Sequence, residues 1–230
     1  MKVAIHQPNF IPWIGYFHKM ANCDIFVLLD DVQLPRGKSI ANRNLIKTSQ
    51  GPKWLTIPVV KRSQLILLKD AEIMVDNKWQ KKHLKTIKFS YQKALFFNDY
   101  IKEIESVYSK NWTNLCNLNK ALIKLIKELL GINTELVLSS EITPSDLKGK
   151  EKIFAILEKL KADIYLSGLG AGSKRYILPD EFKAKKINLV FQDFTHPIYP
   201  QLWGEFIPNL SIIDLLFNCG PDSLKILLGK

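Results

Sequence analysis

The sequence predicts an α/β protein with a mainly parallel sheet and a helical insertion in its middle. Five short apolar runs have the length of strands, at residues 2–6, 24–29, 135–138, 163–167 and 189–191. Continuous apolar runs of this kind are typical of parallel strands that are covered on both faces. Helical patterns separate most of these runs, and such alternation favours a parallel sheet. The 230 residues suit a single domain, 1–230, with residues 77–131 as a helical insertion or subdomain.

The first half of the chain begins with a strand, a short helix and a second strand. The strand at 2–6 breaks at Gln7-Pro8, because proline restricts the residue before it to extended geometry. Residues 14–21 can form the helix, and the run at 24–29 ends in two aspartates. Residues 32–76 are less regular. We expect strands there at 54–60 and 71–75, and Pro58 makes the first of them an edge or interrupted strand.

Residues 77–131 carry three apolar stripes with helical spacing. The last of these helices is expected to stop at Gly131, because glycine suits the position after a helix C-terminus. Farther along, Thr143 and Pro144 resemble a helix start, with a capping side chain and a proline in the first turn. Residues 211–217 predict a final helix.

Composition limits the class of protein. The net charge of +11 raises the question of nucleic acid, but the lysines are scattered along predicted helices without interleaved aromatics, so no specific nucleic-acid binding is expected. An anionic small molecule accounts for the positive field equally well. No apolar run is long enough to cross a bilayer, and residues 1–8 lack the features of a signal peptide. We therefore expect a cytoplasmic protein.

Arginine, cysteine and histidine usage adds detail. Only four arginines occur, so Arg43 and Arg175, which lie in polar motifs, indicate either a bidentate partner such as phosphate or carboxylate, or chance surface positions. The three cysteines lack the spacing of metal ligands, and neither a disulfide framework nor a zinc site is expected. Cys219 is assigned to packing, and His83, among lysines, to the surface.

Polar residues gather where the predicted strands end. In parallel sheets, ligand sites form beyond the carboxyl ends of the strands, so these loops are expected to converge on one cleft. The residues that follow the strands are His6, Gln7 and Asn9, then Asp30 and Asp31, then Ser167 and Gly168 with Ser173, Lys174 and Tyr176, and finally Gln192, Asp193 and His196.

The first two loops hold the candidates for acid–base chemistry. His6 can accept a proton from an amine or hydroxyl near neutral pH, or it is a buried structural histidine bonded to a backbone carbonyl. Asp30 and Asp31 could bind a metal, orient His6 or bind a sugar hydroxyl. Neighbouring side chains in an extended strand point in opposite directions, so one of the two aspartates is expected to face the cleft. The alternative is a turn after a strand, where aspartate is common.

Two further segments suggest anion binding. The glycine-rich loop at 168–174 lets backbone N–H groups approach an anion, although it lacks the Walker A spacing and is otherwise a flexible connection. Residues 12–18, PWIGYFH, are similar to the phosphate-gripping signature of cytidylyltransferase-like proteins. This likeness predicts a Rossmann-like, cytidylyltransferase-like start and makes His18 a catalytic candidate. Tyr16 stands where a second signature histidine would be expected, which puts nucleotidyl transfer in doubt.

The chain resembles the WbqC-like family over nearly its whole length. The segments that carry the resemblance are IHQPNFIPWIGYFHK at 5–19, DIFVLLDDVQ at 24–33, NRNLIK at 42–47, WLTIPV at 54–59, YLSG at 165–168 with YI at 176–177, and FIPNLSIIDLL at 206–216. The first segment is the most specific. The loop after Gly168 departs from the shorter Ser-Gly loop of the family, which leaves the substrate contacts there open.

The resemblance implies a bacterial protein of O-antigen, capsule or modified nucleotide-sugar synthesis, and thus of lipopolysaccharide biosynthesis. Our leading hypothesis is a transferase that moves an acyl or aminoacyl group from a donor to a nucleotide-linked amino sugar. His6 would deprotonate the acceptor amine. The expected catalytic residues are His6, Asp30 and His18, and the expected substrate contacts are Gln7, Asn9, Asp31, Asn42, Arg43, Ser167, Gly168, Ser173, Lys174, Tyr176 and Gln201.

Two alternatives remain open. Nucleotidyl transfer would require Mg²⁺ and a nucleoside triphosphate, whereas acyl transfer needs no metal. A non-catalytic protein of a polysaccharide assembly complex would keep a large exposed apolar patch and would not bring His6 and Asp30 into a shared pocket. The sequence leaves the cofactor and the oligomeric state open.

Overall fold

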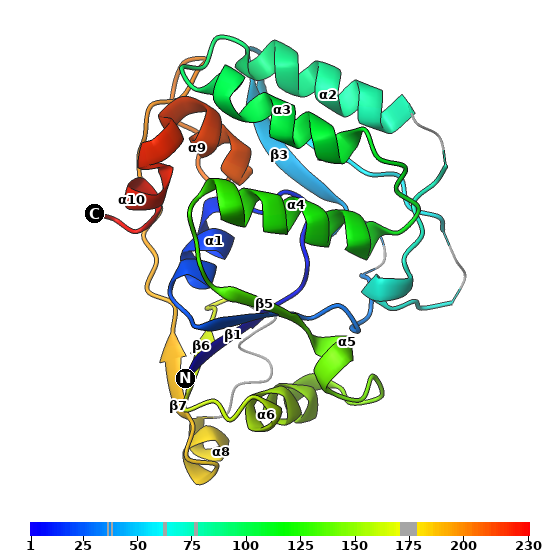
Figure 1. The fold of residues 1–230 in the computed structure, drawn as a ribbon, viewed down its shortest axis with the longest axis vertical. Coiled ribbons are helices and arrows are strands. Elements are labelled where there is room, and N and C mark those ends of the chain that lie inside the picture. Colours follow the sequence, from blue (N-terminus) through cyan, green and yellow to red (C-terminus); the bar gives the residue numbers. More distant parts are fainter. Residues whose placement is uncertain (36, 38, 62–63, 76–77, 171–178) are drawn as a thin grey trace.

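The computed structural model describes residues 1–35, 37, 39–61, 64–75, 78–170 and 179–230 (Figure 1). Its centre is an all-parallel sheet of five strands in the order β5-β2-β1-β6-β7. The strands are β1 (Lys2–His6), β2 (Ile25–Leu28), β5 (Glu135–Leu138), β6 (Ile164–Ser167) and β7 (Asn188–Phe191). The predicted α/β class and the parallel sheet are thus confirmed.

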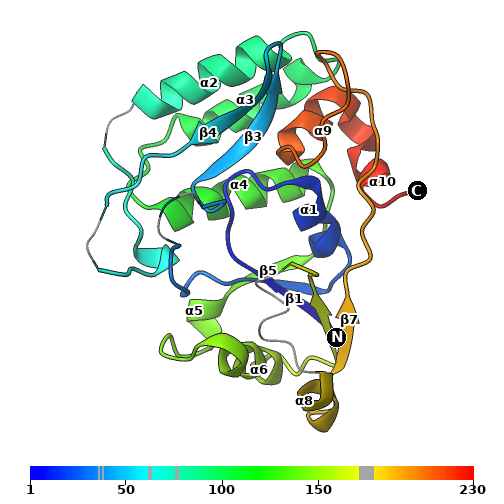
Figure 2. The same cartoon turned by 180° about the vertical axis from the view of Figure 1, so that it is seen from behind.

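Helices cover both faces of the sheet, which explains why its strands are continuous apolar runs. One face carries α1 (Ile14–Ala21) and α4 (Leu115–Leu129), and the other carries α6 (Gly149–Lys159) and α8 (Pro179–Ala184) (Figures 1 and 2). The core is divided in the same way. Ala4, Phe26 and Leu28 pack in the larger apolar cluster, while the alternate residues Val3 and Val27 pack against α6 and α8.

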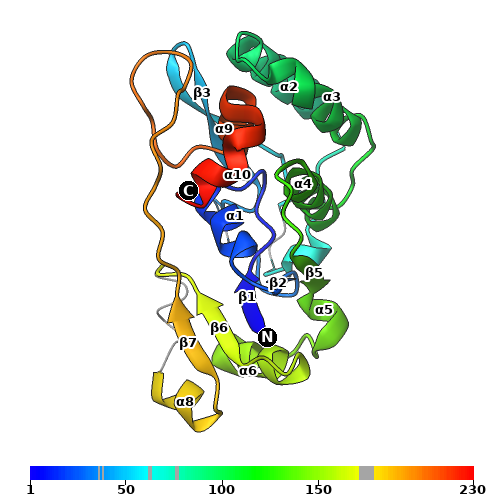
Figure 3. The ribbon, with the colours of Figure 1, turned by 60° about the vertical axis from the view of Figure 1, so that its left-hand side comes forward.

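The helical middle forms an outer layer beyond α4. This outer layer consists of α2 (Lys78–Tyr91) and α3 (Phe97–Tyr108) (Figure 3). Together with α4, they are the three helices expected in this part of the chain. Beside α2 lies an antiparallel hairpin of β3 (Arg43–Thr48) and β4 (Gly51–Thr56). The chain ends in α9 (Ile212–Cys219), the short 3₁₀ turn η2 (Gly220–Asp222) and α10 (Ser223–Leu227).

Two local expectations were wrong, and one strand was missed. Strand β3 was not anticipated, and residues 71–75 form only isolated bridges, Val59 with Ile73 and Glu72 with Asn114, after the 3₁₀ turn η1 (Leu68–Asp70). The helix expected to start near Thr143 is α6, which starts only at Gly149, and a short helix that was not expected, α5 (Ser139–Ile142), ends just before Thr143. Extended backbone at Thr143 ends α5, as expected for a residue before proline.

His83 lies in the core rather than on the surface. It faces away from the lysines of α2, and its Nε2–H donates to the Thr56 carbonyl at 3.1 Å. Its ring packs against Trp79, Phe10 and Tyr108. Burial lowers the pKa of His83 to about 4, so it is neutral at neutral pH. The error arose because one polar residue on a helical apolar stripe is indistinguishable by composition from its charged neighbours.

Gly15 is required by the packing of Trp13. A Cβ at position 15 would lie 2.3 Å from Cη2 of the Trp13 ring. We expect Gly15→Ala to lower the free energy of unfolding by about 1–3 kcal/mol through overpacking. Urea denaturation of the purified variant measures this change.

A Trp13→Ala background provides the matched control. Once the ring is gone, alanine has room and gains about 0.5–1 kcal/mol over glycine in a helix, so the sign of the Gly15→Ala effect should reverse. Equal losses in both backgrounds would contradict the steric explanation.

Candidate active site

The strand order reverses between β1 and β6, because the chain runs from β1 outward through β2 to β5 and then crosses back to β6. In open parallel sheets, the carboxyl ends of the strands at such a reversal are where ligands bind. Pairing of β1 with β6 ends at Ala4 opposite Leu166. His6 and Ser167 therefore lie just past the point where the two strands separate.

The tautomer of His6 is set by its neighbour. The Nδ1–H donates to the Gln7 carbonyl at 3.1 Å, which leaves Nε2 as an unprotonated acceptor. The ring meets Tyr16 edge-on, with 4.8 Å between the ring centroids. Burial, and secondly the charge of Lys19, lower the pKa of His6 to about 3. The imidazole is therefore neutral at neutral pH.

Lys19 is a buried lysine that the sequence analysis did not single out. Its Nζ donates to the Ile5 carbonyl at 2.8 Å and lies 5.9 Å from the centroid of Phe26. Burial lowers the pKa of Lys19 to about 8. The His6 carbonyl bonds the Leu29 N–H on the β2 side. Because successive carbonyls alternate along a strand, the Ile5 carbonyl faces β6, where the ladder has stopped.

Three buried polar oxygens close to residues 6–9 have no hydrogen-bond partner among the described residues: Asn9 Oδ1, Tyr16 Oη and Asn119 Oδ1. Their residues are 2%, 1% and 0% exposed. The orientation of Asn119 is fixed, because its Nδ2 donates to the carbonyls of Pro8 at 2.8 Å and Ala41 at 2.7 Å. An unsatisfied buried polar group costs about 1–3 kcal/mol, so such a group points to a function.

The two aspartates are held on the side of β5. Asp30 accepts from the Ser139 hydroxyl at 2.9 Å, and from the backbone N–H and hydroxyl of Ser140 at 3.0 and 2.6 Å. Asp31 accepts from the Ser139 hydroxyl and forms a fully buried ion pair with Lys152 of α6. Lys152 also donates to the Pro144 carbonyl at 2.7 Å. Within the described ranges, neither carboxylate bonds to His6.

His18 occupies a separate position on α1. The Gln192 amide donates to its Nδ1 at 3.0 Å and to the Gly15 carbonyl at 2.8 Å. Burial lowers the pKa of His18, with the charge of Asp193 acting in the opposite direction. Its ring centroid is 5.0 Å from that of Phe194. Gln192 and Phe194, after β7, are therefore in contact with His18, whereas His196 accepts from the Asn209 N–H at 3.1 Å.

Of the other predicted substrate contacts, Asn42 and Arg43 lie at the start of the hairpin. The Asn42 amide donates to the Ile57 carbonyl at 3.0 Å, and the Arg43 guanidinium stacks 4.0 Å above the Trp54 ring. Stacking leaves the N–H edges of the guanidinium free to bind an anion. Asn42 follows Ala41, which Asn119 joins to Pro8, so this segment is packed on the loop after β1.

Gln201 lies in a second buried network. Its Oε1 accepts from Lys47 Nζ at 3.1 Å and from the Ile207 N–H at 2.9 Å, and its Nε2 donates to the Ile207 carbonyl. The same network contains Asp214, which accepts from the Tyr91 and Tyr199 hydroxyls at 2.8 and 2.9 Å. Burial raises the pKa of Asp214.

Ser167 is the last residue of β6 and Gly168 follows it, beside the separation from β1. Ser167 is buried, and its carbonyl accepts from the Gln192 N–H at 2.7 Å. Ser173, Lys174, Arg175 and Tyr176 lie outside the described residues. In the described part of the chain, His, Cys, Asp and Glu side chains do not form a group of three that could hold a metal ion.

Several residues of this region were missed, although the sequence contains a signal for each. Ser139 and Ser140 follow β5 in the same way that Asp30 follows β2. Asn119 interrupts the apolar stripe of α4, and Lys19 lies one turn beyond Tyr16 on the buried face of α1. A polar residue within an apolar stripe is the pattern common to Asn119 and Lys19.

Because His6 and His83 are neutral when folded, we expect the protein to lose stability in mild acid. Their folded-state pKa values of about 3 and 4 lie below the ordinary value of 6.5. Between these values the unfolded chain binds protons that the folded protein does not. The free energy of unfolding therefore rises with pH across this window. The part of the stability that comes from these two histidines is lost as the pH falls through it.

Urea unfolding between about pH 4 and pH 7 measures this dependence. His83→Gln removes one of the two titrating groups and should flatten the profile. Identical pH profiles for the variant and the parent protein would contradict the assignment of His83 as a neutral core residue.

Comparison with known proteins places the chain in a family. Residues 7–226 match the WbqC-like protein family. The chain is also 37% identical over 230 residues to a Mycobacterium tuberculosis (strain ATCC 25618 / H37Rv) protein named Uncharacterized protein Rv1507c, with 97% of each chain covered. No solved structure shows significant similarity. The resemblance noted in the sequence is confirmed, and the chain belongs to the WbqC-like protein family.

Proposed function

We propose that this protein is a transferase that moves an acyl or aminoacyl group to the amino group of a nucleotide-linked sugar, in O-antigen, capsule or modified nucleotide-sugar synthesis. The observation that carries the proposal is a set of hydrogen-bond acceptors near the end of β1. His6 Nε2 is an unprotonated acceptor, and Asn9 Oδ1 and Asn119 Oδ1 are buried and have no partner among the residues that the structure describes. An amine, rich in N–H donors, complements such a set.

His6 would act as the general base. The amine nitrogen attacks the acyl carbonyl carbon, the new N–C bond forms, and the carbonyl π electrons move to oxygen. The proton of the amine passes to His6 Nε2. When the tetrahedral intermediate collapses, the bond to the leaving group breaks, and His6 returns the proton to that group. The Gln7 carbonyl holds the tautomer that this step needs.

The low pKa of His6 makes it a weak base in the free protein. A nearby negative charge raises the pKa of a histidine, and the phosphates of a nucleotide-linked sugar supply that charge. The strand reversal beside Ser167 is the position where parallel sheets bind phosphates. We assign Ser167 and Gly168, with Ser173, Lys174 and Tyr176, to this group, and Asn42 and Arg43 to a second anionic group. Gln201 has no part in this scheme.

Asp30 and Asp31 have a supporting role in the proposal. Their hydrogen bonds to Ser139, Ser140 and Lys152 fix the loop after β2. With their charges bound there, they leave the acceptors around His6 without a competing carboxylate.

Nucleotidyl transfer is the second candidate, favoured by the strand order, which is that of a nucleotide-binding α/β sheet, and by His18. Thermal denaturation separates the two proposals. Stabilisation by UDP- or dTDP-linked amino sugars, but not by the corresponding sugars with a hydroxyl in place of the amine, supports acyl transfer. Stabilisation by CTP or ATP in the presence of Mg²⁺, without stabilisation by the nucleotide-linked sugars, supports nucleotidyl transfer.

His6→Ala should lower turnover by at least about a hundredfold, because the proton acceptor is lost. Product formation from an amino sugar nucleotide and an acyl donor, followed by mass spectrometry, measures this. Thermal denaturation confirms that the variant is folded, and His18→Ala is the comparison. Unchanged turnover in His6→Ala would remove the base from the scheme, whereas a larger loss in His18→Ala would favour nucleotidyl transfer.

Tyr16→Phe separates a functional hydroxyl from a structural one. The hydroxyl is buried and has no partner in the described ranges, so its removal should leave the free energy of unfolding unchanged or raise it by about 1 kcal/mol. If the hydroxyl bonds the substrate, kcat/KM should nevertheless fall by roughly tenfold. A variant that loses stability and keeps its kcat/KM would show that the hydroxyl serves only the fold.

A further inference from the structure

Helix α2 presents an unusually cationic face to solvent. Five of its 14 residues are lysine and none is acidic, and Lys93 follows shortly after its end. Lys88 pairs with Glu105 of α3. Lys81, Lys82 and Lys85 are exposed and form no ion pair with the described residues. The helix therefore carries unneutralised positive charge on its outer side.

This charge does not serve the fold. Lysines in the first turns of a helix oppose its dipole, and Lys81 and Lys85, four residues apart, repel each other. The inner face of α2 is held by other means, through buried Trp79, His83 and Tyr91. Because the lysines on the outer side lower helix stability, their arrangement points to a negatively charged partner.

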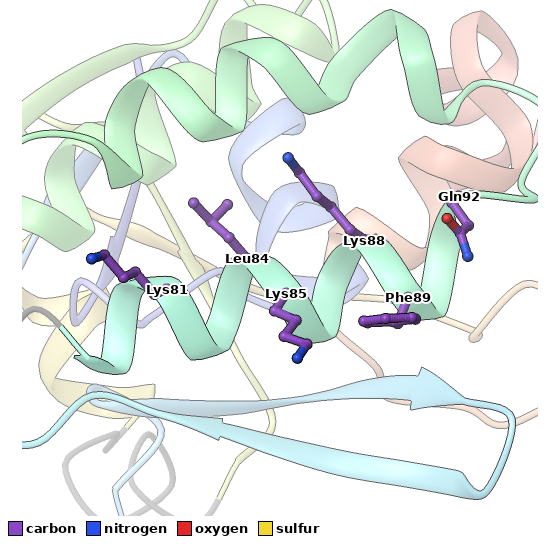
Figure 4. Close-up of a pocket in the computed structure, with 6 residues that line it drawn as sticks. All are labelled: Lys81, Leu84, Lys85, Lys88, Phe89 and Gln92. Atoms are coloured by element: carbon purple, nitrogen blue, oxygen red, sulfur yellow. The ribbon is translucent and has the colours of Figure 1, made fainter.

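The same face contains apolar surface. Lys81, Leu84, Lys85, Lys88, Phe89 and Gln92 line a shallow groove along α2 (Figure 4). Phe89 is 64% exposed, and the Lys85 ammonium lies 5.8 Å from its ring centroid. Leu95, just past the helix, is 81% exposed. Ammonium groups interleaved with exposed Phe and Leu match the interface of an anionic bilayer, in which lysines meet phosphates and apolar side chains insert.

The position of α2 also suits a planar partner. With α3 it forms the layer farthest from α6 and α8, at one end of the molecule (Figures 1 and 3). Nucleic acid is the less suitable partner, because single-stranded binding requires several aromatic stacking platforms and this groove offers one ring. We propose that α2 docks the protein on an anionic phospholipid surface, with Lys81 and Lys85 at the phosphate level and Phe89 inserted. This inference does not depend on the proposed function.

Vesicle flotation with the full chain tests the proposal. The protein should float with phosphatidylcholine vesicles that contain about a third phosphatidylglycerol, stay behind with pure phosphatidylcholine, and be released at about 0.5 M salt. Lys81→Glu with Lys85→Glu should weaken binding by roughly twentyfold or more. Phe89→Ser should also weaken binding to the vesicles, but the remaining binding should depend on salt as it does in the parent protein.

The matched control is Lys159→Glu with Lys183→Glu, on α6 and α8 at the opposite side of the sheet. It changes the net charge equally and should bind as the parent protein does. Equal losses in both double variants, or no flotation of the parent protein, would overturn the proposal. Displacement from vesicles by a single-stranded RNA or by polyglutamate at micromolar concentration would also overturn it in favour of that partner. Circular dichroism confirms folding of each variant.

Discussion

The hydrogen bond from Lys19 to the Ile5 carbonyl is the contact on which the region around His6 depends. Where β1 and β6 separate, the Ile5 carbonyl has lost its ladder partner, and a buried carbonyl without a partner is costly. The ammonium supplies the missing donor and lies between α1 and the sheet. Its charge also helps to keep His6 neutral. One lysine thus satisfies the carbonyl at the point where the β1–β6 ladder stops and adds to the effect of burial, which is the main reason that the histidine there is neutral.

A second constraint is the separation of charge along the strand ends. The carboxylates of Asp30 and Asp31 are bound by hydroxyls and by the Lys152 ammonium, on the β5 side of the sheet. Charges paired inside a protein are fixed, because breaking such a pair costs about 3–5 kcal/mol. The groups around residues 6–9 that have no partner among the described residues, Asn9 Oδ1, Tyr16 Oη and Asn119 Oδ1, are all uncharged. In the proposed site these groups would bind the ligand through hydrogen bonds, and an anionic group of the ligand would lie elsewhere, toward β6 or the hairpin.

The layout of the sheet could be predicted from the sequence, because each parallel strand is covered on both faces and so appears as an apolar run. The hairpin could be predicted only in part. The strand expected at 54–60 overlaps the end of β4, most of whose residues are exposed, whereas β3 was missed because it contains Lys47, which is buried only because residues 201–205 accept its hydrogen bonds. The strand-end rule located His6 and the aspartates, but their partners depend on tertiary contacts. Ser139 reaches Asp30 across 109 positions and Asn119 reaches Pro8 across 111. Local sequence patterns cannot predict contacts between residues that are so far apart in the chain.

The outer helix and the loop after β1 form one connected body. Phe10, next to Asn9, packs against His83 of α2, with 5.8 Å between the ring centroids. At the C-terminal end of α2, the Tyr91 hydroxyl accepts from the Lys47 N–H and donates to Asp214. The middle and the C-terminal end of the helix are therefore fixed to elements that also contact the core. A surface that bound the outer face of α2 would hold the end of β1 at a set height and orientation, because packed interiors transmit position without much deformation. Contact at the outer layer would then orient the region around His6 relative to that surface and leave its geometry unchanged.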